Sequence, residues 1–293
     1  MVEAKDLLPQ EVMGGFPESI DVNPTAQCNL ACRFCWGPEH SIPDGLDTNQ
    51  WKDALSFFSE NGTNSVVFTG GEPLIRQDIG ELVKFAHDLG MRVTLSTNTL
   101  LLPRKAESVL PYVHEIGIPI DGSDAANNGK MRIGNPRAFQ ASLNALELLS
   151  QSYPDVHVTV RTVVSKVNSD DIESIGGLLA SKKDMFDRWK LYQFAPVSIG
   201  AGNQDEFNIS TAHFMGIVGQ VSEKFPDLPI ASYPSENRVG RYVFIGPEGN
   251  IFGVDATEGY RTTGHVKDLR STPSEKLFGG VYSDYRNKMH AHT

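Results

Sequence analysis

The chain has 293 residues, of which 40% are hydrophobic and 21% are charged, a composition typical of a soluble globular protein. Its formal net charge of −10 argues against a nucleic-acid partner, because proteins that bind phosphate backbones usually present a basic face. The first ten residues include charged side chains and show no apolar signal segment, and no apolar run is long enough to span a bilayer. We therefore expect a cytoplasmic protein without a membrane partner.

Residues 1–18 form an irregular lead-in, after which short apolar runs alternate with amphipathic segments. The runs predict strands at 19–25, 65–69, 92–97, 116–121, 156–164 and 188–197. Helical spacing of apolar residues predicts helices at 49–60, 78–89, 104–110, 137–151 and 170–182. In 137–151, the apolar face comprises Phe139, Leu143, Leu146 and Leu149.

Strands that alternate with helices predict βαβ units and a parallel sheet. There are too few units for a complete barrel, which has eight strands. The predicted fold is therefore α/β, an open (β/α)6 partial barrel over residues 19–200. Functional side chains of such folds lie at the carboxyl ends of the strands.

Residues 201–293 form a second region, predicted to be an α+β extension that covers the barrel. A helix is expected at 211–224, and a hairpin at 241–255 around the turn Pro247-Glu248-Gly249-Asn250. The boundary is placed near 200, at Gly200-Ala201-Gly202-Asn203.

Cys28, Cys32 and Cys35 are the only cysteines of the chain, and all of them fall within eight positions. Their clustering indicates one metal centre, and the absence of cysteines elsewhere fits a reducing compartment. Thiolates suit iron–sulfur clusters and zinc. Two other interpretations remain open: a Cys3His zinc site that uses His40, and buried apolar cysteines without a metal.

The spacing C-x3-C-x2-C, with aromatic Phe34 before the last cysteine, resembles the signature of the radical S-adenosylmethionine (radical SAM) enzymes. The resemblance implies one [4Fe–4S] cluster held by three thiolates, with S-adenosylmethionine bound to the fourth iron. It also implies that an electron donor such as flavodoxin or ferredoxin reduces the cluster. The cofactor is then cleaved to a 5′-deoxyadenosyl radical, which takes a hydrogen atom from the substrate.

Gly70, Gly71 and Glu72, followed by Pro73, come directly after a predicted strand. Glycines let a backbone approach a ligand closely. The resemblance implies that this motif binds the amino group of S-adenosylmethionine, although an ordinary strand-to-helix turn has the same composition. The family position for adenine contact is Phe34, although packing in the core would explain this aromatic residue as well.

Two further strand ends carry polar residues. Ser96 and Asn98 end the third predicted strand, where hydroxyl and amide groups suit a ribose diol and where the resemblance implies ribose contacts. A polar strand end that caps the next turn is the alternative. Asp121 ends the fourth strand, and Arg132 matches in spacing the family arginine that binds the cofactor carboxylate.

Two observations bear on which residue binds the cofactor carboxylate. Pro119 stands where a serine is common in the family, so one cofactor hydrogen bond is absent or comes from elsewhere. Arg161 is a rival candidate, because a charge inside an apolar strand needs a partner. We assign no catalytic acid, base or hydrogen donor.

The C-terminal region indicates which subgroups of the radical SAM family the chain resembles. Pro247 to Ile251 and Gly264-His265-Val266 resemble the SPASM and twitch proteins, whose extra cysteines hold auxiliary clusters that this chain has no ligands for. The tail and Arg188 to Gln193 also resemble viperins. Viperins carry a lysine soon after the third cysteine that helps hold a nucleoside triphosphate, whereas Trp36 to His40 contain none.

About 19 residues precede the first predicted strand, too few for an N-terminal peptide-recognition domain. We therefore expect a small-molecule substrate in biosynthetic tailoring, with a ribosomal peptide as the second candidate. The alternative of another class is a non-catalytic zinc-binding module.

Overall fold

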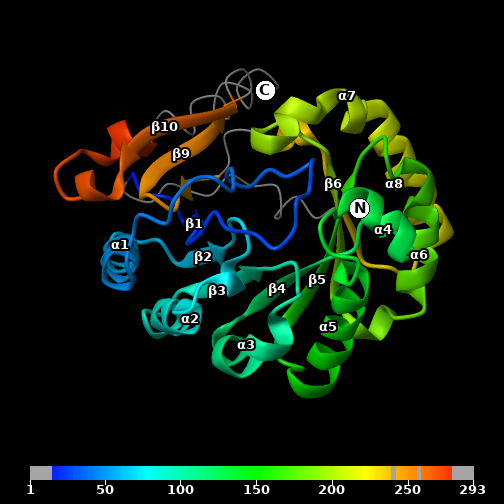
Figure 1. The fold of residues 1–293 in the computed structure, drawn as a ribbon, viewed down its shortest axis with the longest axis horizontal. Coiled ribbons are helices and arrows are strands. Elements are labelled where there is room, and N and C mark those ends of the chain that lie inside the picture. The colour runs from blue at the N-terminus through cyan, green and yellow to red at the C-terminus, as the bar shows by residue number, and fades with distance from the viewer. Residues whose placement is uncertain (1–14, 239–241, 256–258, 279–293) are drawn as a thin grey trace. The chain divides into compact units, whose positions relative to one another are not determined.

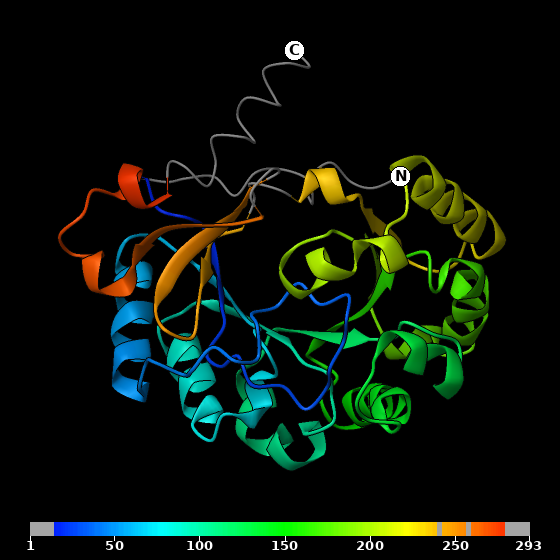
Figure 2. The ribbon, with the colours of Figure 1, turned by 45° about the horizontal axis from the view of Figure 1, so that its top comes forward.

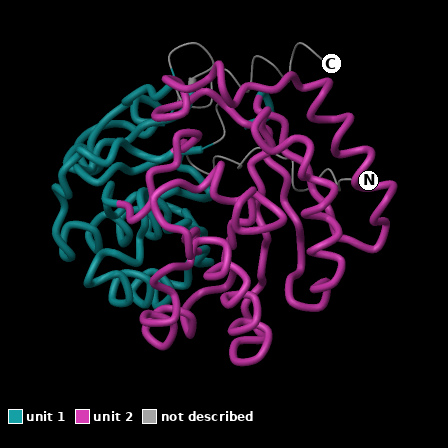
Figure 3. Tube along the Cα trace, turned by 45° about the vertical axis from the view of Figure 1, so that its right-hand side comes forward, with its two compact units in different colours: residues 1–27, 37–94, 236–293 teal, residues 28–36, 95–235 magenta. Residues whose placement is uncertain are grey.

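A computed structural model of the chain describes residues 15–238, 242–255 and 259–278. The chain divides into two compact units, coloured separately in Figure 3. Unit 1 comprises residues 1–27, 37–94 and 236–293, and unit 2 comprises residues 28–36 and 95–235. Strand β3 (Arg92–Ser96) is divided between them after Thr94.

Unit 1 contains strands in the order β10-β9-β8-β1-β2. Parallel pairing joins β1 (Ser19–Val22) to β2 (Ser65–Phe68) and to β8 (Phe244–Ile245). Antiparallel pairing joins β8 to β9 (Asn250–Asp255) and β9 to β10 (Gly259–His265). The helices of the unit are α1 (Thr48–Glu60), α2 (Ile79–Asp88) and the short 3-10 turns Pro73–Ile75 and Val266–Asp268.

Helix α1 illustrates how sequence sets an element. Asp47 and Gln50 form a reciprocal capping box that satisfies the first backbone N–H groups of the helix. Trp51, Leu55 and Phe58 then recur at helical spacing and are all buried.

Unit 2 contains four parallel strands in the order β4-β5-β6-β7. They are β4 (Glu115–Pro119), β5 (His157–Val164), β6 (Arg188–Gln193) and β7 (Ile230–Tyr233). Its helices are α3 (Leu102–Val109), α4 (Ala125–Met131), α5 (Ala138–Ser152), α6 (Ile172–Ala180), α7 (Gln204–Phe207) and α8 (Thr211–Lys224). Short 3-10 turns occur at Leu110–Tyr112, Ser169–Asp171, Lys183–Met185 and Ser198–Asn203.

The two faces of the unit 2 sheet differ in chemistry. Side chains alternate along each strand, and Ile118, Val160 and Leu191 on one face are fully buried. Helices lie along this side of β4 to β6, with α5 against β4 and α8 against β6 (Figures 1 and 2). The opposite face, here called the polar face, carries the half-buried residues Glu115, Arg161, Lys190 and Tyr192.

The structure confirms the predicted α/β class with a parallel sheet, and each predicted strand and helix is present with small shifts at its ends. Within the described ranges, α4, α7, β7 and β10 are additional strands and α-helices that the sequence reasoning missed. Residues 244–255 form the predicted hairpin, while Arg241 lies outside the described residues. The predicted boundary at 200, inside the turn Ser198–Asn203, and the covering role of the tail stay predictions.

The buried face of α5 is not the predicted one. Leu146 and Leu149 are buried as expected, but Phe139 and Leu143 are only half-buried. The small residues Ala138, Ser142 and Ala145 are buried instead. Small side chains let the helix lie close to the sheet, so that the Ser142 hydroxyl donates to the Pro119 carbonyl at 2.7 Å.

No helix in the part of the chain that the structure describes is both long and apolar enough to cross a membrane.

This packing predicts unequal costs for two leucine truncations on the same helix. Leu149→Ala should lower the free energy of unfolding by about 2–5 kcal/mol, because it opens a cavity in a fully buried site. Leu143→Ala should cost about 1 kcal/mol, since the surroundings of a half-buried side chain can fill with water. Urea unfolding of both variants checks this, and equal losses would contradict the observed face.

Candidate functional site

The cysteine loop, residues 28–36, belongs to unit 2 and packs into its core. Cys32 is buried, Cys28 and Cys35 are half-buried, and none of the three forms a disulfide. They contact a cluster of buried side chains: Leu30, Phe34, Met131, Ala138, Phe194 and Phe207. Within the loop, the Cys35 N–H donates to the Cys32 carbonyl at 3.2 Å, which folds the chain back and brings the thiols to one region.

The surroundings of Cys32 disfavour a free thiolate. Burial raises the pKa of the Cys32 thiol to about 12; nearby Arg132 opposes this rise, and Cys35, Asp121 and Cys28 add to it. A bound metal centre supplies the positive charge that deprotonates such a thiol outright. Three thiols held together in an apolar surrounding therefore fit the ligand set of a metal–sulfur centre.

The arrangement of the thiols does not by itself separate a cluster from a single metal ion. Among the described residues, no three His, Cys, Asp or Glu side chains are placed as ligands of one metal ion. The [4Fe–4S] cluster and the zinc alternative with His40 both stay predictions at this point.

A segment far along the chain clamps the cysteine loop. The Asn203 side chain accepts from the Arg33 guanidinium at 2.9 and 3.1 Å and donates to the Arg33 carbonyl at 3.1 Å. The Arg33 Nη1 atom also pairs with Glu206 at 2.6 Å. The Gly200 N–H donates to the Cys35 carbonyl at 3.0 Å, so both ends of this stretch of the loop are fixed.

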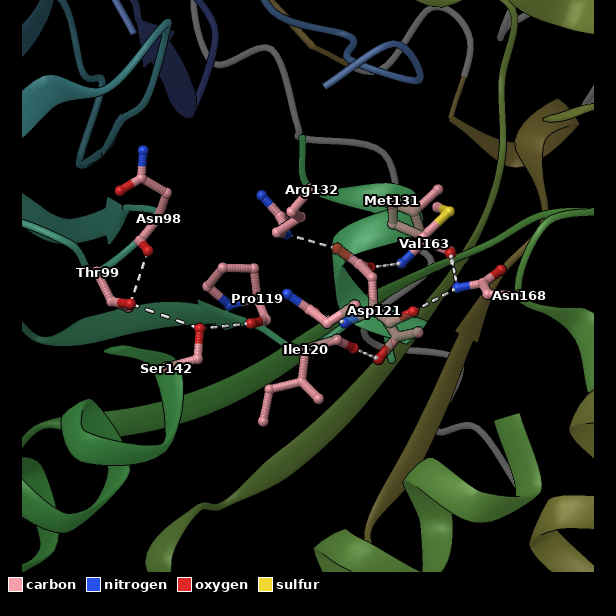
Figure 4. Close-up of polar contacts among 12 residues, drawn as sticks. Asn98, Thr99, Pro119, Ile120, Asp121, Met131, Arg132, Ser142, Val163 and Asn168 are labelled. Carbon is pink, nitrogen blue, oxygen red and sulfur yellow. Dashed lines mark hydrogen bonds and ion pairs between the residues drawn. The ribbon is translucent and has the colours of Figure 1, made fainter. Parts of the chain in front are cut away.

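The end of β3 holds the loop from another direction. The Asn98 amide donates to Asn29 at 2.6 Å and lies 3.8 Å from the Cys28 sulfur. Thr99, which is fully buried, has φ 69°, an unusual conformation for a β-branched residue. Its hydroxyl donates to the Asn98 carbonyl at 2.6 Å, which stabilises the turn (Figure 4).

A buried ion pair stands at the end of β4 (Figure 4). Asp121 is 0% exposed, and its Oδ2 accepts from the Arg132 Nε at 2.6 Å. Its Oδ1 accepts from the Val163 backbone N–H at 2.7 Å. The Asn168 amide donates to the carbonyls of Asp121 and Val163 at 3.0 and 2.9 Å, which ties the ends of β4 and β5 together.

The pair aims the guanidinium of Arg132. Burial lowers the pKa of Arg132, but attraction by Asp121, Cys32 and Cys35 together outweighs burial, and the pKa is raised above its ordinary value. The guanidinium carbon lies 5.5 Å from the Phe34 ring centre. In the described part of the chain the Nη groups have no hydrogen-bond partner, so a side chain that is 16% exposed presents two donors to a ligand.

Arg161 lies on the polar face in a charged group. It donates to the Ser96 hydroxyl, and its Nη2 lies 3.4 Å from Glu115 Oε1. Lys190 Nζ lies 2.8 Å from the same oxygen. Burial opposes ionisation of Glu115, yet Lys190 and Arg161 lower the pKa of this carboxyl to about 2. Arg161 thus has its charge partner within the sheet.

The glycine motif belongs to unit 1, after β2. Gly70 has φ 113°, and a Cβ on Gly71 would lie 2.2 Å from the Gln27 carbonyl oxygen. Only glycine allows this approach to the chain that leads out of β1. Glu72 is fully buried and caps the next turn by accepting from the Leu74 N–H at 3.0 Å.

The structure groups the predicted site residues into sets. Unit 2 brings together the cysteines, Phe34, Asn98, Asp121 and Arg132, and separately pairs Ser96 with Arg161. The glycine motif lies in unit 1. The ligand contacts themselves stay predictions. Sequence reasoning missed the residues that hold these groups in place: Asn29, Arg33, Thr99, Asn168, Asn203 and Glu115. The charged residue Glu115 at the start of an apolar strand was a usable signal, whereas the asparagines carried none.

The chain is similar in sequence and in structure to proteins that use S-adenosylmethionine. Residues 22–179 match the model of the Radical SAM superfamily. The chain is 31% identical over 202 residues to AdoMet-dependent heme synthase of Nitratidesulfovibrio vulgaris, a match that covers 65% of this chain and 51% of that protein. It therefore spans about half the length of that relative. It is 25% identical over 260 residues to S-adenosylmethionine-dependent nucleotide dehydratase of Selenomonas ruminantium, covering 84% of this chain and 89% of the relative.

Among solved structures, Streptococcus suis SuiB bound to S-adenosylmethionine superimposes with a TM-score of 0.73 at 16% identity, covering 92% of this chain and 68% of SuiB. This similarity shows the fold and confirms the predicted partial barrel.

The clamp on the cysteine loop predicts the effect of one distant substitution. Asn203→Ala removes the hydrogen bonds to Arg33. If this lowers the free energy of opening the loop by about 1.4 kcal/mol, the open state should become about tenfold more populated. Loss of iron from the reconstituted protein to a chelator, followed by absorbance, should accelerate accordingly. Asp205→Ala, at an exposed neighbour, is the control, and equal rates for both variants would contradict the clamp.

The lowered pKa of Glu115 predicts a pH dependence of stability. A carboxyl whose pKa falls from 4.5 to about 2 on folding stabilises the fold above pH 4.5, and the contribution is lost as the pH falls toward 2. The wild type should therefore lose about 2 kcal/mol relative to Glu115→Gln between about pH 5 and pH 3. Urea unfolding at the two pH values measures the difference, and a pH-independent difference would rule out the ion-pair assignment.

Proposed function

The chain belongs to the radical SAM superfamily, and we propose that it binds one [4Fe–4S] cluster and S-adenosylmethionine and acts on a small molecule. The observation that carries the proposal is the thiol triad in the clamped loop. Cys28, Cys32 and Cys35 provide three thiolates, whereas a cluster that only transfers electrons usually has four protein ligands. One iron would remain open to a ligand other than the protein.

The residues around the triad suit S-adenosylmethionine. Arg132, oriented by Asp121, presents two N–H donors in the planar geometry that pairs with a carboxylate. Independently of these residues, the glycine motif of unit 1 is the candidate for the amino group of the cofactor, through backbone carbonyls that no glycine side chain covers. Ser96 and Asn98 at the end of β3 supply polar groups for the ribose, and Phe34 supplies a ring for the adenine.

When bound, the reduced cluster and S-adenosylmethionine supply a radical that takes a hydrogen atom from the substrate. This chain's own residues bind, orient and shield. Phe34, Phe194 and Phe207 pack together in the side-chain cluster that buries Cys32 and contacts Cys28 and Cys35. The electrons are proposed to come from a reductant such as flavodoxin or ferredoxin.

A small-molecule substrate is favoured by the relatives. The heme synthase and nucleotide dehydratase names both denote reactions on small molecules, and the nucleotide dehydratase aligns over most of both chains. A triphosphate is the less favoured nucleotide, because Trp36 to His40 offer no lysine. A peptide substrate is the second candidate, since a SuiB structure that covers 96% of this chain holds the precursor peptide SuiA.

The test is anaerobic. Reconstituted protein with dithionite and S-adenosylmethionine should form 5′-deoxyadenosine, and Cys32→Ala should form none, because the cluster loses a ligand that is buried in the core. Met131→Leu is the matched control, since it changes a buried neighbour in the same cluster of side chains but keeps the thiols. A wild-type protein that holds stoichiometric zinc and no iron–sulfur cluster would contradict the proposal.

A further inference from the structure

One arginine of unit 1 contacts two stretches of chain that are distant from it in sequence. Arg76 comes shortly after the glycine motif. Its Nη1 atom donates to the Pro24 carbonyl at 2.9 Å and to the Leu46 carbonyl at 3.1 Å. Pro24 lies between β1 and the first cysteine, and Leu46 lies between the last cysteine and α1. One nitrogen therefore joins the stretch before the cysteines to the stretch after them.

Asp78 orients the rest of this guanidinium. The Nε and Nη2 atoms of Arg76 donate to its two carboxylate oxygens at 2.6 and 2.9 Å, and the Thr48 hydroxyl donates to it at 2.5 Å. Burial opposes ionisation of Asp78, but the hydrogen bonds from Arg76 and Thr48 outweigh burial and lower the pKa of this carboxyl. The side chain of Arg76 is 11% exposed. A bidentate pair that is shielded from water fixes the plane of the guanidinium, and with it the direction in which Nη1 points.

The stretch that the guanidinium holds is the one against which the glycine motif lies. The Gly71 N–H donates to the Thr25 carbonyl at 3.0 Å, and the Glu72 N–H donates to the Gln27 carbonyl at 2.8 Å. Pro24 directly precedes these acceptors, and residues 24–27 are here called the acceptor segment. Any movement at its first residue shifts the carbonyls on which the position of the motif depends.

A second ion pair shows what Arg76 adds to unit 1. Lys52 of α1 lies 2.5 Å from Glu81 of α2, and its ammonium group also lies over the Phe85 ring of α2. These contacts connect α1 to α2 without involving the acceptor segment. The two helices are thus linked independently of Arg76, whose distinct contribution is its pair of hydrogen bonds to backbone carbonyls.

We propose that Arg76 is a positioning residue for S-adenosylmethionine, which holds the acceptor segment where the glycine motif needs it in order to present its backbone to the amino group of the cofactor. The N–H groups of Gly71 and Glu72 are already used within unit 1, which leaves carbonyls rather than these N–H groups to contact an ammonium group. The inference rests on the proposed function for the identity of the ligand, whereas the hold on the acceptor segment does not. Arg76 acts through the backbone.

The first readout is hydrogen exchange, measured by mass spectrometry on the reconstituted full-length protein before S-adenosylmethionine is added. In Arg76→Met, the N–H groups of Gly71 and Glu72 should exchange at least about tenfold faster than in the wild type, because their acceptors lose an anchor. Lys52→Met is the matched control, since it breaks an ion pair of unit 1 that does not reach the acceptor segment. These N–H groups should exchange in the control as in the wild type.

The second readout is S-adenosylmethionine affinity, measured by anaerobic calorimetry and expressed per bound cluster. Arg76→Met should keep the cluster and bind the cofactor at least about tenfold more weakly, whereas Lys52→Met should bind it like the wild type. Arg76→Lys keeps the charge, but its single nitrogen cannot serve two carboxylate oxygens and two carbonyls at once, so both readouts should resemble those of Arg76→Met. If Arg76→Met does not fold, Asp78→Asn removes the charge that orients the guanidinium, and it should shift both readouts in the same direction.

Four results would overturn the proposal: unchanged exchange, unchanged cofactor affinity, full rescue by Arg76→Lys, or loss of the cluster from Arg76→Met, which would place the effect at the thiols. A wild type that holds the cluster but binds no S-adenosylmethionine has a different meaning. It refutes the proposed function and the identity of the ligand, and the exchange rates still decide whether Arg76 holds the acceptor segment.

Discussion

The buried contact between Asp121 and Arg132 determines how the parts of the site in unit 2 are held. Both oxygens of Asp121 are used, one by the guanidinium and the other by a backbone N–H of the next strand. Removing either partner of such a pair costs about 3–5 kcal/mol, because an uncompensated charge remains inside the protein. Since Arg132 also packs on Phe34, the pair links β4, β5 and the cysteine loop. The position of the thiols therefore depends on the ends of β4 and β5 as well as on the sequence of the cysteine loop.

The predictable parts of this molecule are those with a local signal. Strand β5 and helices α1 and α8 follow from residue pattern alone, and the cysteine triad follows from short spacing. Helix α4 has two asparagines and a glycine, which are poor helix formers, so its sequence does not resemble a helix. The contact between Arg33 and Asn203 joins residues that are 170 positions apart, and no local sequence pattern predicts it. Tertiary packing also decided which face of α5 is buried, where small residues were favoured over Phe139.

The distribution of charge separates the surface from the site. The chain as a whole carries a net charge of −10, yet Arg132, Arg161 and Lys190 gather in unit 2, where Asp121 and Glu115 are their carboxylate partners. Long-range repulsion of anions by an acidic protein is screened over about 8–10 Å at physiological salt, whereas close contacts in a partly buried site are screened much less. Local geometry, rather than the net charge, would therefore govern whether this region binds an anionic ligand.

Gly117 shows that an absent side chain can determine where a charge lies. The guanidinium of Arg161 on β5 occupies space that a side chain at position 117 of the neighbouring strand would fill. An alanine there would displace the guanidinium and disturb its contacts with Ser96 and Glu115. The arrangement of charge on the polar face therefore depends on a residue that carries no charge. A comparison of related proteins by their charged residues alone would miss this dependence.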